Sequence, residues 1–256
     1  MVHFIAKSEQ IFGSMPESLG SELKQDLFTS VLLFLQTFQK NLERKQIIAL
    51  PYSVEICKTM WSLSAIAGDP SQIIPHYKIL ISLLLEHNFT WVNRNQTRLS
   101  SSEAFQIYQT YLYTKNNAIL PSEFVDNLKS LIKEYSLNQI KDVSMLHLEV
   151  CKVVERMKIS YKIEDKLEDI DVDIILGDIF EDYMIVIDIH GYQHYFRNAE
   201  VLKGNNIFKR KLVRTLGYKY FEIPIFVWQG LFDEDSKYEY IEKGIVGLMG
   251  QEKFAQ

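Results

Sequence analysis

The chain has 256 residues, a mass of 30.0 kDa and an apolar share of 47%, so it can bury a core and cannot be disordered throughout. Its formal net charge of −5 argues against a protein that coats nucleic acid through bulk positive charge, and no apolar run approaches the ~20 residues that span a bilayer. Two cysteines, Cys57 and Cys151, cannot form a disulfide framework or complete a zinc site alone, which indicates a reducing compartment.

The first half of the chain carries the spacing of amphipathic helices. Apolar residues recur at steps of three and four, which predicts helices over 21–44, 54–67, 74–85, 101–113 and 121–135. The second of these ends at Gly68-Asp69-Pro70, a strong helix terminator. We therefore expect a helical array over 1–140, and helix pairs stacked as in repeat proteins would also fit the pattern.

From residue 145 onward the pattern changes to an α/β type. A helix over 145–156 is followed by predicted strands over 171–176 and 184–190, a helix over 205–216 and a strand over 219–223. The run 184–190 is apolar almost throughout, which is typical of a central strand covered on both faces. The order helix, strand, strand, helix, strand predicts a compact α/β unit.

Charge is divided between two neighbouring segments of this second half. Residues 161–188 hold ten acidic and two basic side chains, whereas 197–219 hold seven basic side chains and one acidic. The ordinary interpretation is two solvated faces of opposite sign. The alternative is that the basic segment forms a phosphate-binding helix in an otherwise acidic protein.

Two acidic residues on the predicted strands could do chemistry. Asp173 and Asp188 approach each other if the strands pair as a hairpin, and His190 shares a face with Asp188. Carboxylates at the end of a sheet suit Mg²⁺ beside a phosphodiester, with Glu149 as a third carboxylate and His190 as a general base. An acid at the end of an apolar strand otherwise pairs with a neighbouring base, and the basic residues 209–211 are available for that.

The second half also resembles a known family, through residues that stand in the family's order: Val172-Asp173-Ile174, the run 187–195, Asn198, Gly204, Lys209-Arg210, Leu216-Gly217-Tyr218, Ile223-Pro224 and Trp228. Over 141–235 the chain is similar to the RAP domain, an RNA-binding module abundant in apicomplexan parasites and a relative of the PD-(D/E)XK and very-short-patch repair endonucleases. The resemblance implies a small restriction-endonuclease-like α/β domain over 141–235. A helical array over 1–140 precedes this domain, and a helical tail over 236–256 follows it.

The resemblance also implies roles for the acidic residues. Asp173 and Asp188 stand at the family's acidic positions, and His190 stands where the related nucleases have their lysine. Without that lysine we expect a degenerate site in a protein that is not an enzyme and needs no cofactor. The alternative is a Mg²⁺-dependent endoribonuclease, in which Asp173 and Asp188 hold the metal and His190 completes the catalytic set.

The function that the resemblance implies is RNA binding in an organelle. We expect a mitochondrial protein that acts in RNA processing or stability or belongs to the mitochondrial ribosome, although the first twenty residues do not form a clear presequence. Its expected partners are organellar rRNA or mRNA and other proteins of a ribonucleoprotein complex, and no membrane; a protein-binding scaffold in such a complex is the further alternative. RNA phosphates would be bound by the basic helix 203–219, and the predicted contact residues are Lys203, Lys209, Arg210, Lys211, Arg214, Tyr192, His194 and Tyr195.

Overall fold

The computed structural model describes the chain over the ranges 17–43, 53–67, 69–95, 99–114, 120–137, 143–177, 184–197 and 200–249. By its contacts the chain divides into two compact units. The first comprises Met1–Gln139 and Lys203–Phe208, and the second comprises Ile140–Leu202 and Lys209–Gln256. The described residues are mostly helical with one small mixed sheet, which confirms the expected combination of α and α/β structure. Of the described helices, none combines the length and apolar character that crossing a bilayer needs.

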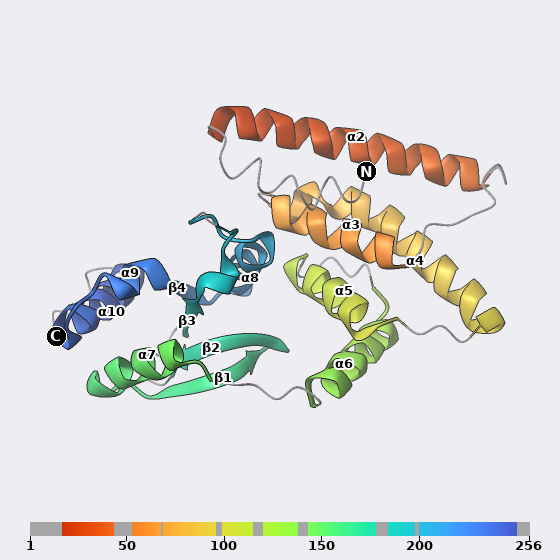
Figure 1. Ribbon diagram of the computed structural model, residues 1–256. Coiled ribbons are helices and arrows are strands. Elements are labelled where there is room, and N and C mark those ends of the chain that lie inside the picture. The colour runs from red at the N-terminus through yellow and green to blue at the C-terminus, as the bar shows by residue number, and fades with distance from the viewer. Residues whose placement is uncertain are drawn as a thin grey trace. The chain divides into compact units, whose positions relative to one another are not determined.

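The first unit is an array of helices (Figure 1). Its elements are α2 (Glu17–Glu43), α3 (Ser53–Ile66), the short 3₁₀ helix η1 (Pro70–Gln72), α4 (Ile74–Asn95), α5 (Ser101–Tyr113) and α6 (Ser122–Leu137). Helix α4 packs against α2 and α3, and α5 packs against α3 and α6. Local sequence sets the start of α5, because Ser100 Oγ accepts the Glu103 N–H while the Glu103 carboxylate accepts the Ser100 N–H at 2.8 Å.

The second unit is built on a four-stranded sheet of order β1-β2-β3-β4. The strands are β1 (Tyr161–Leu167), β2 (Ile170–Leu176), β3 (Ile185–His190) and β4 (Lys219–Pro224). Neighbours β1 and β2, and β2 and β3, are antiparallel, whereas β3 and β4 are parallel and are joined through the 3₁₀ helix η2 (Tyr192–His194) and α8 (Gly204–Thr215). Every residue of β3 is buried, as its apolar sequence predicts for a central strand.

Strand β1 is the element that the sequence pattern does not predict. It lies at the edge of the sheet and mixes charged with apolar residues, so it shows no continuous apolar run. Its hairpin to β2 turns through Glu168 and Asp169, which both have positive φ, at 49° and 63°. Two-residue turns of this kind are usually signalled by Asn-Gly or Asp-Gly. The described part of the unit therefore has four strands, where three are expected.

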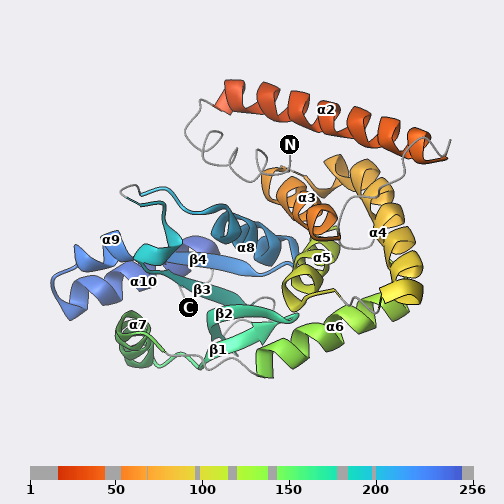
Figure 2. The same ribbon diagram turned by 45° about the vertical axis from the view of Figure 1, so that its right-hand side comes forward.

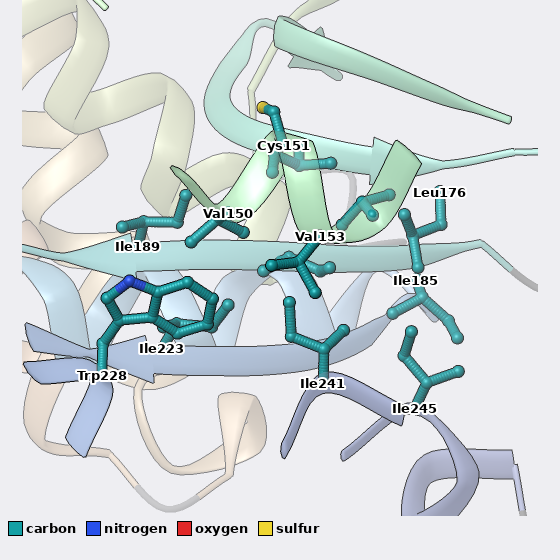
Figure 3. Packing of buried hydrophobic residues seen from close by; sticks show 13 residues of the cluster. Val150, Cys151, Val153, Leu176, Ile185, Ile189, Ile223, Trp228, Ile241 and Ile245 are labelled. Atoms are coloured by element: carbon teal, nitrogen blue, oxygen red, sulfur yellow. The ribbon is translucent and has the colours of Figure 1, made fainter. Parts of the chain in front are cut away.

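Helices cover both faces of this sheet (Figure 2). On one face, α7 (Met145–Arg156), α9 (Ile225–Gln229) and α10 (Glu234–Met249) contribute to the main apolar cluster shown in Figure 3. Helix α10 supplies Ile241 and Ile245 to this cluster, so the described part of the predicted tail 236–256 belongs to the core. On the other face, Val213 of α8 packs in a second cluster with Val186 of β3 and Tyr220 of β4.

Candidate nucleic-acid interface

A buried carboxylate lies on the central strand of the sheet. Asp188 of β3 is 1% exposed, and its Oδ1 lies 2.5 Å from Nζ of Lys209 on α8. Its Oδ2 accepts hydrogen bonds from His190 Nε2 at 2.8 Å and from the hydroxyl of Tyr220 on β4. His190 is fully buried as well. Of the two interpretations of this acid, the structure therefore shows the pairing with a base from 209–211.

The electrostatics of this cluster keep the ion pair charged. Burial by itself would raise the pKa of Asp188, but the charge of Lys209 and the hydrogen bond from His190 outweigh burial and hold that pKa well below its ordinary value. Burial lowers the pKa of Lys209, yet the charges of Asp188 and Asp173 raise it above the ordinary value. Burial and the neighbouring Asp188 charge also raise the pKa of Tyr220, so its hydroxyl stays a donor.

Asp173 comes close to Asp188 along the backbone, but its carboxylate has other partners. The paired residues of β2 and β3 end at Ile174 and Ile187, and Asp173 is the neighbour of Ile174 on β2. There, Asp173 Oδ2 accepts the backbone N–H of Ile189 at 2.6 Å, and Nε2 of His147 on α7 lies 3.6 Å from the same oxygen. The side chain of Asp173 therefore joins β2 to β3 at the point where the backbone pairing of the two strands stops.

The carboxylate of Glu149 on α7 also has hydrogen-bonding partners. Its Oε2 accepts the indole N–H of Trp228 at 3.0 Å and a hydrogen bond from Nζ of Lys237 at 3.0 Å. These two hydrogen bonds lower the pKa of Glu149. Glu149 therefore anchors α9 and α10 to α7.

The hydrogen bonds and ion pairs of these three carboxylates do not suit a Mg²⁺ site. Magnesium binds carboxylate oxygens directly, but both oxygens of Asp188 already have hydrogen-bonding partners, one of them the ammonium group of Lys209. Asp173 and Glu149 are held by donors of their own. Among the residues that the structure describes, no group of three or more His, Cys, Asp or Glu side chains could hold a metal ion. The residues present do not fit the metal that the nuclease interpretation requires.

Two predicted phosphate contacts of α8 are paired inside the protein. Lys209 is bound to Asp188, and Nη1 of Arg210 lies 3.2 and 3.1 Å from the two carboxylate oxygens of Glu222 on β4. To bind phosphate, either side chain would have to leave a carboxylate that is itself largely buried. The interpretation of Lys209 and Arg210 as RNA contacts is therefore replaced by a structural one, in which they fasten α8 to β3 and β4.

The other predicted cations have different surroundings. Arg214 is exposed near the end of α8, with its guanidinium carbon 5.9 Å from the centroid of the Tyr220 ring. Lys211 lies half-buried three residues before it, and therefore on the same side of the helix. Lys203 is exposed just before α8 and belongs to the first unit by its contacts. Lys211 and Arg214 are thus the predicted phosphate contacts that share a helix side in the second unit.

The predicted stacking residues are only partly available to a base. Tyr195 is 7% exposed, because its ring packs edge-on against Phe226 of α9 at 4.8 Å between centroids and against His190 at 6.2 Å. The half-buried ring of His194 stacks on His190 at 5.2 Å. The ring of Tyr195 therefore forms part of the core, and its role as a stacking platform stays a prediction.

Tyr192 of η2 differs, because it is 56% exposed. Its hydroxyl donates to Gln229 Oε1 at 2.5 Å, and its ring meets Phe226 edge-on at 5.3 Å. These two contacts fix the orientation of Tyr192 while more than half of the residue stays open to solvent. Tyr192 therefore keeps the geometry that base stacking needs.

Sequence reasoning missed two residues of β4 that organise this region. Tyr220 and Glu222 are two positions apart and so share the face toward α8, where they bind Asp188 and Arg210. The available signal was the polar character of these alternate positions in a strand beside the apolar β3.

Residues 187–243 match the family model of the RAP domain. The protein carries a RAP domain. The match includes Asp188, His190, Lys209 and Tyr220, so the whole buried cluster belongs to the RAP segment, and RAP domains are generally RNA-binding. Asn198, which also contributes to the resemblance, lies outside the described residues. A comparison with curated proteins gives no significant match.

Proposed function

We propose that the protein binds RNA in a mitochondrion, where it acts in the processing or stability of organellar RNA or as a component of the mitochondrial ribosome. The match of residues 187–243 to the RAP domain carries this proposal, because that domain is generally RNA-binding. We infer the mitochondrial location from the resemblance to the RAP family, because proteins of this family act mostly in organelles.

The phosphate contacts that we propose are Lys211 and Arg214 on α8. They carry positive charge on one side of the helix, and Arg214 is exposed to solvent. Few phosphate contacts give weak, sequence-independent binding. Such binding suits a protein whose place on RNA is set in part by neighbouring proteins of a complex.

We also propose that the sheet is of the restriction-endonuclease type and that its acidic centre has become structural. The mixed sheet with an acid near the end of its central strand supports this kinship. The Lys209 ammonium balances the Asp188 charge that a metal ion would balance in an active nuclease. The acid is retained in this proposal because it positions α8.

The RNA-binding proposal is tested by fluorescence anisotropy with a labelled single-stranded RNA and the full-length protein, over a series of salt concentrations. Each phosphate contact to a single strand adds about 0.7 to the slope of log K against log salt, so replacing Lys211 and Arg214 by alanine should lower the slope by about 1.4 and weaken binding. Lys162→Ala is the matched control, because Lys162 is an exposed lysine of β1. Equal slopes for the double variant and the control would contradict the proposed contact residues.

The mitochondrial proposal is tested separately with the full-length protein carrying a C-terminal tag in its native cells. Fractionation should place the protein with mitochondria, and sucrose-gradient sedimentation distinguishes the two roles. A ribosome component sediments with the mitochondrial ribosome, and an RNA-processing factor sediments apart from it. Recovery in the cytosol alone would refute the mitochondrial proposal and leave the RNA-binding test unaffected.

A further inference from the structure

One large aromatic side chain of the second unit lies almost wholly in solvent. Phe232 is 96% exposed, the highest value among the large apolar side chains that the structure describes. It lies in the short connection between α9 and α10. Val227 of α9, five residues earlier, is 42% exposed. An aromatic ring that is exposed to this degree can enter a pocket on a partner, and aromatic residues are enriched among the anchors of protein interfaces.

The turn that presents Phe232 is held on both sides. Before it, the Leu231 N–H donates to the Trp228 carbonyl at 3.2 Å, and the Leu231 side chain packs against the main apolar cluster. After it, the Asp233 carboxylate accepts the Ser236 N–H at 2.6 Å and caps α10. The backbone on either side is therefore fixed, and the ring has no route into its own core without the loss of these contacts.

The surroundings of Phe232 are acidic. Residues 233–243 hold five acidic and two basic side chains, a net charge of −3. Both basic side chains are engaged by carboxylates, Lys237 by Glu149 and Lys243 by Glu239, each at 3.0 Å. Glu234 is exposed directly beside the turn. An RNA strand would bring its phosphates against this negative charge, whereas a cationic protein surface would be attracted to it.

We propose that Phe232, with Asp233 and Glu234 next to it in the chain, forms a docking surface for a protein segment rich in lysine and arginine. Phe232 is the anchor that a pocket on the partner covers, and the carboxylates pair with the basic residues around that pocket. This surface lies at the connection between α9 and α10, and it involves none of the proposed phosphate contacts on α8. The protein therefore holds RNA and a basic protein through different elements of one unit.

The test uses the full-length protein in its native cells, with a photo-reactive phenylalanine analogue in place of Phe232. The same analogue in place of Ile163 is the control, because Ile163 is an exposed apolar residue of β1. Crosslinked peptides are identified by mass spectrometry. We expect position 232 to give an adduct with one protein segment in which lysine and arginine outnumber aspartate and glutamate, and position 163 not to give it.

The crosslinked segment is then synthesised as a labelled peptide and titrated with the purified full-length protein. Phe232→Ala should weaken its binding at least tenfold and Glu234→Lys several-fold, while Ile163→Ala should leave it unchanged. An adduct with RNA, an adduct with an acidic segment, the same adducts from both positions, or no adduct from position 232 would each overturn the proposal. So would equal peptide affinities for Phe232→Ala and Ile163→Ala.

Discussion

Replacing Lys209 by methionine is the sharpest test of the buried ion pair. Methionine keeps much of the length of the side chain and removes its charge, so that Asp188 stays buried at 1% exposure without its cation. Breaking a buried pair on one side typically costs about 3–5 kcal/mol in unfolding free energy. Because Tyr220 and His190 still donate to Oδ2, we expect a loss near the lower value, about 3 kcal/mol.

Hydrogen exchange measured by mass spectrometry reports this loss where it occurs. Since 1.4 kcal/mol is a factor of ten, amides of β3 and α8 should lose protection by roughly a hundredfold. Lys162→Met is the control, because Lys162 is 77% exposed and lies 3.7 Å from Asp165, an exposed pair worth at most about 1 kcal/mol. Adding Asp188→Asn to Lys209→Met should recover part of the loss, because the unpaired charge disappears. If Lys209→Met and Lys162→Met change the protection of β3 equally, the ion pair does not hold α8.

Further predictions concern acid stability and two glycines of α10. The pKa of Asp188 is lowered in the folded protein, so its carboxylate stabilises the fold fully above its ordinary pKa of 3.8, and this stabilisation is lost as the pH falls from there toward the folded pKa. Asp188→Asn should therefore flatten the decline of the unfolding free energy below pH 4. An unchanged acid titration of the unfolding free energy would count against the ion pair. Gly244→Ala should destabilise the protein in urea unfolding, because a Cβ would stand 2.2 Å from the Phe221 ring and overpacking typically costs about 1–3 kcal/mol. Gly247→Ala in the same helix meets nothing within 4 Å and should stabilise by up to about 1 kcal/mol, so equal effects of the two changes would contradict the packing of α10 on β4.

The helices and the central strand were predictable because their apolar spacing is strong. Strand β3 reads as a buried run, and α8 shows its apolar face through Phe208 and Leu212. Strand β1 was not predictable, because it lies at the edge of the sheet and its turn uses Glu168 and Asp169 at positive φ without a glycine. A positive φ at two acidic residues is settled by the hairpin that surrounds them and has no local sequence signal.

The sequence indicates which residues belong to the candidate site but not which residues they contact. The sequence indicates that Asp188 needs either a metal or a base, and the choice depends on which side of α8 faces the sheet. Lysines and arginines in a run all look solvated in sequence, yet Lys209 and Arg210 point to β3 and β4 while Arg214 is exposed. Only the three-dimensional packing of α8 separates the side chains that hold the fold from those that can meet a phosphate.

The RAP match starts inside β3, which has a consequence for how such a domain can move between genes. Residues 187–243 contain Ile187 and Ile189, which share their apolar cluster with Val150 of α7 and Ile174 of β2, both upstream of the match. A gene fusion that transferred only the matched residues would carry part of β3 without its neighbouring strand β2 and without α7. Inheritance of this domain as a folded unit therefore requires the preceding helix and hairpin to be transferred with it.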